Sequence, residues 1–331
     1  MKHLNADQTY FVEEFYEHYR SGDLSRRQFI KLLAHITGSM AATATLMTLL
    51  GCTPEELPAP TEPIPATEAP ASPATASSTP AQPAPSGLTP VPGAQSPLSI
   101  PEGDPDLVAE DVTFANGSDT ITAYLAQPIR SVTIPCILVC HENRGLTPHL
   151  RDVARRFAKA GYAALALDLL SREGGSDALD ASQIPGLLGD AGTERHIADF
   201  LAGYTYLKTL PNIDSARVGM TGYCFGGGIT WDVAASLPEL KAAVPFYGRA
   251  PSLPVTTIQA AVLGVYAEQD GRINGGIPAL EQALKDAGIT YQFNIYPGVD
   301  HAFHNDTGGR YVEAQATQAW MDTLAWFEQY L

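Results

Sequence analysis

The sequence predicts an α/β fold, with a mostly parallel central sheet flanked by helices on both faces. Apolar, β-rich runs alternate with helical patterns from about residue 106 to the C-terminus, and such alternation gives parallel strands joined by helices. Several of the runs are apolar throughout, as in strands that are buried on both faces. A proline-rich segment separates this region from a leader, so we divide the chain into residues 1–52, 53–105 and 106–331.

The first elements of the folded region are a hairpin and two buried strands. The run "EDVTFANGSDTITAYLAQP" alternates around "NGSD", which favours two short antiparallel strands. The runs "IPCILVC" (134–140) and "AALALD" (163–168) are continuous apolar strands. Between them, "LRDVARRFAKAGY" has helical spacing and a terminal Gly161, which is typical of a helix end.

The second half of the region repeats the alternation. We expect a helix near 194–209, a strand at 217–223 ("RVGMTGY") and a helix directly after a glycine-rich turn. The remaining expected elements are strands at 242–248 and 260–268, a helix at 277–288, a strand at 291–297 and a final helix at about 311–330. In such sheets reactive groups collect at the carboxyl ends of the strands.

Composition limits the partners and the cofactors. The chain has 331 residues, of which 45% are hydrophobic, and a formal net charge of −16, which argues against nucleic acid and anionic membrane surfaces as partners. Its four cysteines show no zinc-site spacing, and we expect neither a metal nor an organic cofactor. Cys136 and Cys140 would lie roughly 13 Å apart along a strand, too far for a disulfide.

The leader, residues 1–52, has the features of an export signal. "SRRQFIKLLA" (25–34) resembles a twin-arginine motif, and an apolar stretch diluted by Ala, Thr and Gly follows it. The stretch ends in "LLGC", which resembles a lipoprotein processing box with Cys52 as the lipidated residue. The alternative is an uncleaved N-terminal anchor. Both readings place the folded region on the extracytoplasmic side of the cell membrane, in contact with it only through the N-terminus.

Residues 53–105 form the expected spacer. Fifteen of the 26 prolines of the chain fall here, among Ala, Thr, Ser and Glu. Such a segment buries too little apolar surface to offset its ordering entropy. We therefore expect a disordered, extended linker between the leader and the folded domain.

The stretch "VGMTGYCFGGG" (218–228) carries the strongest chemical signal. It has the Gly-x-nucleophile-x-Gly spacing of a strand-to-helix turn, with Cys224 in the nucleophile position. The glycines are needed because the chain is crowded around a strained nucleophile. A thiol placed just before a helix lies near its positive terminus, which favours the thiolate.

Two further strand ends complete a catalytic pattern. Asp270 follows the strand at 260–268, and His301 follows the strand at 291–297. The order Cys, Asp, His is that of the α/β-hydrolase triad with cysteine in place of serine. His301 would take the proton of the thiol, and Asp270 would fix the histidine tautomer.

Neighbouring residues offer alternatives for two of these roles. Asp300 and Asp306 are rivals of Asp270, which we prefer because it follows a strand directly. His304 is a rival of His301, and we expect it in a pocket wall or at the surface.

Residues 106–331 resemble the dienelactone hydrolase family in five segments: "CHENRG", "GYAALALDL", "GYCFGGG", "AEQDGRI" and "GVDHAF". The resemblance implies an α/β-hydrolase that cleaves a small lactone or ester through a thioester acyl-enzyme. It assigns Cys224 as nucleophile, His301 as base and Asp270 as third member. It also implies that Glu142 contacts the resting thiol, and that the backbone N–H groups of Phe225 and Asn143 form the oxyanion hole.

The resemblance extends to substrate binding with one departure. Arg172 matches an arginine that holds the carboxylate of the substrate, but Asn305 stands near the position of the second family arginine. Half of the carboxylate clamp is therefore missing, and Arg144 is a candidate to replace it.

Two other functions stay open at this point. A binding module could retain the pocket to capture a small acid without catalysis, although an intact triad favours the enzyme. A redox role for Cys224 is a third option, but no partner cysteine is positioned in the sequence to resolve a sulfenate. We expect a monomer.

Overall fold

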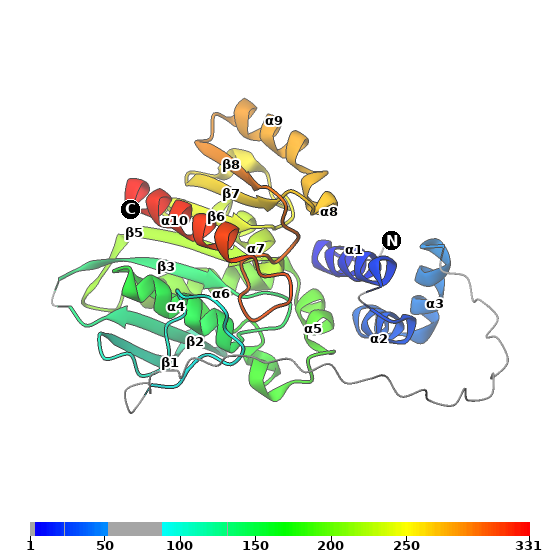
Figure 1. Cartoon of the computed structure of the whole chain (residues 1–331), viewed down its shortest axis with the longest axis horizontal. Coiled ribbons are helices and arrows are strands. Elements are labelled where there is room, and N and C mark those ends of the chain that lie inside the picture. The colour runs from blue at the N-terminus through cyan, green and yellow to red at the C-terminus, as the bar shows by residue number, and fades with distance from the viewer. Residues whose placement is uncertain (1–3, 23, 52–87, 131) are drawn as a thin grey trace, which may run out of the picture.

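The computed structural model describes residues 4–22, 24–51, 88–130 and 132–331 (Figure 1). Cys52 and residues 53–87 of the expected spacer lie outside the described residues, and what the sequence predicts for them stays a prediction.

An eight-stranded sheet in the order β1-β2-β4-β3-β5-β6-β7-β8 forms the centre of the molecule (Figure 1). β1 and β2 form an antiparallel hairpin, β2 is antiparallel to β4, and all other neighbours are parallel. The strands are β1 (Leu107–Asn116), β2 (Asp119–Pro128), β3 (Ile134–Cys140), β4 (Ala163–Leu167), β5 (Ile213–Tyr223), β6 (Ala242–Phe246), β7 (Ala261–Ala267) and β8 (Tyr291–Tyr296). The prediction of a mostly parallel α/β sheet is confirmed.

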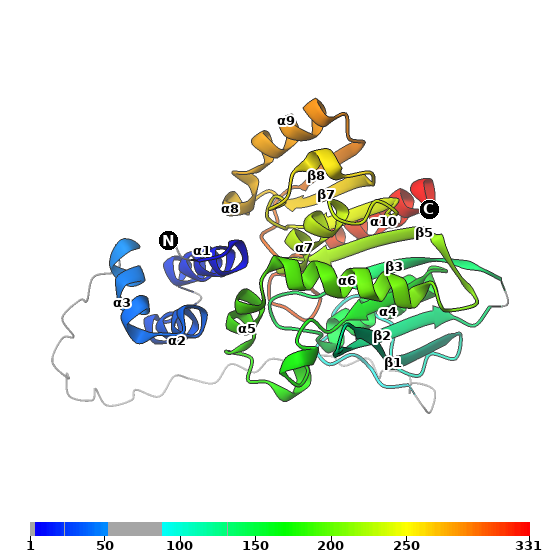
Figure 2. The same cartoon turned by 180° about the vertical axis from the view of Figure 1, so that it is seen from behind.

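Helices cover both faces of this sheet. α4 and α10 lie on one face (Figure 1), and α6 and α7 lie on the other (Figure 2). The helices of this region are α4 (Pro148–Lys159), α5 (Ile184–Ala191), α6 (Thr193–Leu207), α7 (Phe225–Ala234), α8 (Gly271–Asn274), α9 (Ile277–Ala287) and α10 (Glu313–Tyr330). Three short 3₁₀ turns occupy Ser171–Glu173, Ser176–Ala178 and Val255–Thr257.

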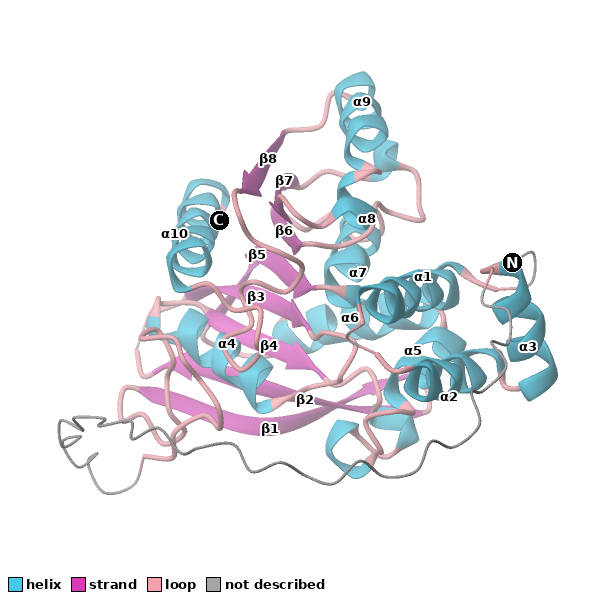
Figure 3. Cartoon of the chain, turned by 45° about the vertical axis from the view of Figure 1, so that its right-hand side comes forward, coloured by secondary structure: helices cyan, strands magenta, loops and turns pink. Residues whose placement is uncertain are grey.

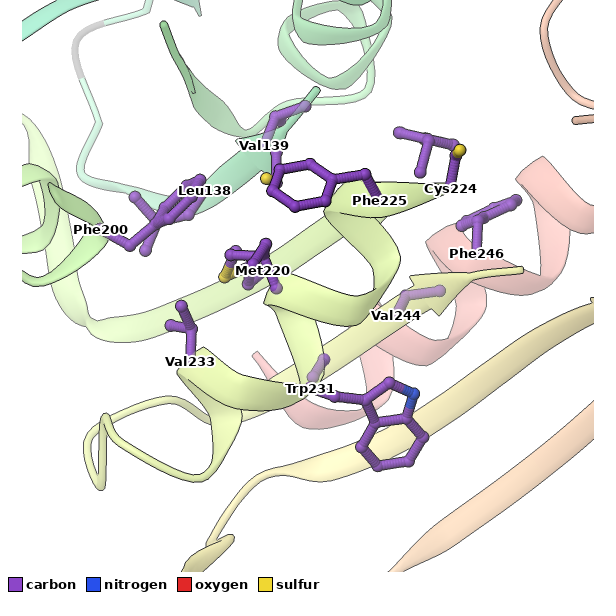
Figure 4. Close-up of a cluster of buried hydrophobic side chains, with 14 of the residues drawn as sticks. Leu138, Val139, Phe200, Met220, Cys224, Phe225, Trp231, Val233, Val244 and Phe246 are labelled. Carbon is purple, nitrogen blue, oxygen red and sulfur yellow. The ribbon is translucent and has the colours of Figure 1, made fainter. Parts of the chain in front are cut away.

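The hydrophobic core lies between the sheet and these helices, and it fixes the elements that carry the site. Figure 4 shows part of it, where α7 packs on β3, β5 and β6. The labelled core side chains are Leu138, Val139, Phe200, Met220, Phe225, Trp231, Val233, Val244 and Phe246, all buried. Cys224 sits at the end of this cluster, between β5 and α7. The predicted nucleophile turn therefore rests on a closely packed part of the hydrophobic core.

The described end of the expected spacer differs from a free linker, because residues 88–105 pack on the folded domain. Thr89 forms a β-bridge with Glu102, and the backbone N–H of Gln95 donates to the carbonyl of Asp306 at 3.0 Å. The N–H of Ile100 donates to a carboxylate oxygen of Asp152 at 2.7 Å. Hydrogen bonds of the backbone depend little on the type of side chain, so the composition of this segment does not predict them.

The leader forms three helices, α1 (Ala6–Ser21), α2 (Arg26–Thr37) and α3 (Met40–Leu49). α1 and α2 contact α5, and α1 also lies beside α7 (Figure 3). Among the described residues, no single helix has the length and apolar character of a bilayer span. α2 and α3 together meet that test of length and composition, but they are bent by 117° at their break.

Candidate active site

Cys224 occupies a sharp turn between β5 and α7. Its backbone has φ 59° and ψ −119°, a region that non-glycine residues avoid. Its N–H donates to the carbonyl of Phe246 at the end of β6, at 3.1 Å. The turn is so tight that a Cβ at Gly222 would lie 2.2 Å from the carbonyl oxygen of Gly226. Gly222 is therefore required here, and Gly226 is required because a Cβ there would lie 2.5 Å from the carbonyl oxygen of His141.

His301 and Asp270 meet at the same edge of the sheet. Asp270 follows β7 and caps α8, where its Oδ1 accepts from the N–H of Ile273 at 3.2 Å. Its other oxygen lies 2.6 Å from Nδ1 of His301, which follows β8. Both side chains are buried. This hydrogen bond leaves Nε2 as the ring nitrogen available for chemistry.

The rivals of these two residues have other partners. Asp306 binds His149 and Arg156 in a buried network, at 2.8 and 2.7 Å. Asp300 accepts from the backbone N–H of its neighbour His301 at 2.6 Å. His304 is buried, and its ring stacks on that of Tyr223. The geometry therefore selects Asp270 as the carboxylate on the ring of His301.

The thiol, the imidazole and a carboxylate of the leader converge. One ligand atom each of Glu14, Cys224 and His301 lie within 4.8 Å of one another. The two oxygens of Glu14 lie 3.7 and 3.9 Å from Sγ of Cys224, and the hydroxyl of Tyr10 lies 3.1 Å from Sγ. Both residues come from α1. The sequence analysis missed them, because nothing local in the leader indicates a contact more than two hundred residues away.

Burial and charge set the protonation states of the pair. Burial and the carboxylate of Glu14 raise the pKa of the Cys224 thiol, so the thiolate is disfavoured while α1 covers it. Burial lowers the pKa of His301, but the sulfur of Cys224 and the carboxylate of Asp270 outweigh it and raise that pKa to about 10. The hydrogen bond from His301 outweighs burial at Asp270 and lowers the pKa of its carboxyl.

Glu142 and Asn143 follow β3 and lie near this site. Glu142 is buried and accepts a hydrogen bond from the side-chain amide of Asn305 at 2.6 Å. The amide of Asn143 donates to Glu14 at 2.8 Å. The carboxylate in hydrogen-bonding distance of the thiol is therefore that of Glu14, whereas Glu142 is held by Asn305.

The comparisons with known proteins identify the family of the chain. The sequence model described as "Dienelactone hydrolase family" matches residues 121–331. The chain belongs to the dienelactone hydrolase family. A protein of Methylorubrum extorquens and one of Escherichia coli K12, both named "Putative carboxymethylenebutenolidase", are 36% and 35% identical over 241 and 243 residues. These matches cover 68% and 69% of this chain and 82% and 89% of the relatives.

Solved structures of the dienelactone hydrolase family share the fold. The "Putative Dienelactone Hydrolase from Klebsiella pneumoniae" superposes with a TM-score of 0.64 at 32% identity, over 68% of this chain and 99% of that one. A dienelactone hydrolase from Anabaena variabilis covers the same shares with a TM-score of 0.54 at 24% identity, and shows the fold alone. The predictions of an α/β-hydrolase fold and of a hydrolase of this family are confirmed.

The arginines predicted to bind substrate lie elsewhere. Arg172 forms a two-pronged ion pair with Asp199, with both distances at 2.8 Å, and a further ion pair with Asp119. Arg144 is exposed and has no hydrogen bond or ion pair within the described part of the chain. Asn305, in the place of the second family arginine, is bound to Glu142. The structure therefore does not bring a two-arginine clamp together at Cys224.

Another arginine lies next to His301 and Asp270. Arg272 extends from α8, two residues after Asp270, and borders a cavity of about 380 Å³ together with His301. Its side chain is 10% exposed, and its Nε lies 3.2 Å from a carboxylate oxygen of Glu17. Its guanidinium lies over the ring of Tyr10, 4.7 Å from the centroid. This basic group was not singled out from the sequence, because "DGRI" gives no indication of where the side chain points.

The residues around Cys224 also define a candidate metal site. Glu14, Cys224 and His301 offer a carboxylate, a thiol and an imidazole, the ligand types of a three-ligand zinc centre. Within the described ranges, no other group of three such side chains comes this close together. Two of the three are the predicted nucleophile and base, so metal binding and covalent catalysis at this site would exclude each other.

Proposed function

We propose that this chain cleaves small lactones or esters through Cys224, His301 and Asp270, by way of a thioester acyl-enzyme. The observation that carries the proposal is the convergence of the three side chains. A cysteine held at a strained strand-to-helix turn lies beside a histidine, and the other nitrogen of that histidine is 2.6 Å from a buried carboxylate. This is the nucleophile, base and orienting acid of acyl-transfer enzymes.

The reaction follows from the chemistry of these groups. Cys224 and His301 share one proton: when it lies on His301, the thiolate and Asp270 stabilise the imidazolium, and this thiolate attacks the carbonyl carbon of the substrate. The backbone N–H groups of Phe225 and Asn143 are the proposed donors to the oxyanion. When the intermediate collapses, His301 returns the proton to the leaving alkoxide, which in a lactone remains attached to the acyl chain. Water then attacks the thioester with His301 as base, and this step regenerates the thiol.

The leaving group limits the substrate class. A thiolate is a better leaving group than an amine, so a tetrahedral intermediate from an amide would return to substrate unless the amine were protonated first. An alkoxide or enolate competes better, and thioesters hydrolyse readily. Lactones and esters are therefore the proposed substrates, and amides are not.

The cellular location of the protein is part of the proposal. Arg26 and Arg27 begin α2 directly after its N-cap Ser25, and Arg27 is exposed. We infer an exported enzyme on the extracytoplasmic side of the membrane, with Cys52 as the lipid attachment site. Radiolabelled palmitate incorporated into the wild type and absent from Cys52→Ala would support this, whereas equal labelling would contradict it.

The test of the catalytic proposal uses the full chain. The hydrolysis of p-nitrophenyl acetate and of a dienelactone is compared in the wild type, Cys224→Ala and His301→Ala. Each substitution should lower kcat/KM at least a hundredfold for any substrate that is turned over, with circular dichroism showing an intact fold. For a substrate that the wild type turns over, rates near those of the wild type in either variant would remove the triad from the mechanism.

A further inference from the structure

Helix α1 fills the space directly in front of the nucleophile. The hydroxyl of Tyr10 lies 3.1 Å from Sγ, and the carboxylate of Glu14 lies 3.7 Å from it. The ring of Phe11 stacks on Phe225, whose backbone N–H is a proposed oxyanion donor, with 5.1 Å between the centroids. As a result only 3% of Cys224 is exposed.

These contacts exclude a substrate in the attack position. A carbonyl carbon poised for attack lies about 3–3.5 Å from the nucleophile. The Tyr10 oxygen already occupies that shell around Sγ. The acyl group and Tyr10 cannot both be there, so α1 has to move away before the thiol reacts.

The rest of α1 is anchored by specific polar contacts. Asp7 is fully buried and pairs with Arg249 at 2.9 Å, and it accepts from the hydroxyl of Thr193 at 3.0 Å. The side-chain amide of Asn5 donates to the carbonyl of Gly189 at 2.7 Å. A buried carboxylate that is paired with an arginine and a hydroxyl is typical of a specific interface, because a buried carboxylate without partners would be strongly disfavoured.

Arg272 binds a carboxylate of α1 in this interface. It has the carboxylate of Glu17 on one side and the ring of Tyr10 against its guanidinium. When α1 leaves, Arg272 loses both partners and faces the cavity that borders His301. Arginine is the side chain best suited to bind a planar carboxylate.

We propose that α1 is an internal ligand of the active site, which keeps Cys224 latent, and that Arg272 binds an anionic group of the substrate after α1 has left. While α1 is bound, Glu17 occupies the place of that anionic group. The proposal rests on the proposed role of Cys224 as nucleophile. It predicts a substrate that carries a carboxylate near the scissile ester, held by Arg272 and not by Arg172. In an exported protein processed at Cys52, removal of the leader would remove α1 with it.

The latency is tested by the reactivity of the thiol, which does not depend on hydrolysis. The full chain is alkylated with iodoacetamide, and modification of Cys224 is followed by peptide mass spectrometry. The double substitution Asp7→Asn with Phe11→Ala removes two anchors of α1 and should speed alkylation at least tenfold. The control Glu13→Ala changes an exposed position of the same helix and should leave the rate unchanged.

A synthetic peptide with the sequence of residues 4–22 provides the second arm. Added to the double variant, it should slow the alkylation of Cys224, and a peptide with Tyr10→Ala and Phe11→Ala should not. Alkylation at one rate in the wild type and in a folded double variant overturns the proposal. If the double variant does not fold, Tyr10→Ala alone replaces it, with the same expectation.

The role of Arg272 is tested in the double variant with a pair of esters that differ in one carboxylate. Arg272→Gln should raise KM for the anionic ester at least tenfold and change KM for the neutral ester less than twofold, and Arg272→Lys should recover part of the loss. Arg217→Gln, which removes a surface arginine paired with Asp214, controls for the lost charge. Equal effects on both esters overturn this assignment. Faster alkylation without hydrolysis of either ester would refute the catalytic proposal and leave the latency standing.

Discussion

The tight approach of α7 to β6 makes Gly227→Ala an informative substitution. Gly227 lies inside α7 with an ordinary helical backbone, so propensity alone predicts a gain of about 1 kcal/mol from alanine. The structure predicts the reverse. The added Cβ would lie 2.3 Å from the carbonyl oxygen of Phe246 and 2.9 Å from Cα of Gly248. The neighbour is backbone, which cannot rotate away.

The expected outcome is a less stable and less active protein. Overpacking of this kind costs about 1–3 kcal/mol, so after the gain in propensity a net loss of about 1 kcal/mol remains and Tm falls by about 2–4 °C. The Phe246 carbonyl also accepts from the N–H of Cys224, so its displacement should move the nucleophile and lower kcat/KM at least tenfold. Thermal unfolding and ester hydrolysis measure the two effects.

Gly309→Ala is the matched control, because a Cβ there meets no atom within 4 Å and the glycine has no positive φ. Its Tm should change by no more than about 2 °C and its activity should be unchanged. A rise in Tm for Gly227→Ala with full activity would refute the reasoning. It would mean that helix propensity outweighs the contact on which the nucleophile turn depends.

Three further predictions follow from the buried charges. Asp306→Asn should lower the free energy of unfolding by about 2–4 kcal/mol. The hydrogen bond with His149 and the charge of Arg156 outweigh burial and hold the pKa of Asp306 well below its usual range. In urea titrations at several pH values, the loss of stability should therefore be full above about pH 5 and shrink as the pH falls. Arg172→Ala should lower the free energy of unfolding by about 1–3 kcal/mol, since buried Asp199 loses its charged partner and keeps only Asn116. It should not raise KM selectively for an anionic ester. The raised pKa of His301, about 10, should stabilise the fold fully below about pH 6.5 and less as the pH rises towards 10, so the Tm difference from His301→Gln should diminish over that range.

The fold was largely predictable because its signals are local. The "NGSD" hairpin pairs Asn116 with Asp119, as the turn residues indicate. Buried parallel strands such as β3 and β7 were visible as apolar runs, since both faces of each strand are covered. The end of the spacer was not predictable, because residues 88–105 are held by backbone hydrogen bonds that leave no hydrophobic pattern.

The candidate site was predictable only where chain order and strand ends determine it. Cys224, Asp270 and His301 each follow a strand, and the topology brings those ends together. The partners of Arg172 could not be predicted, because an ion pair with a helix residue depends on tertiary packing. The same holds for the contact of Tyr10 with the thiol.

A covalent intermediate on Cys224 is the most direct test of the central claim. The double variant Asp7→Asn with Phe11→Ala is mixed with p-nitrophenyl acetate, quenched in acid within the first turnover and measured by mass spectrometry. The account predicts one acetyl group per chain, mapped to Cys224, removed by neutral hydroxylamine as a thioester is, and absent from Cys224→Ala. Release of p-nitrophenol with no adduct on Cys224, or with the acetyl group on another residue, would contradict it.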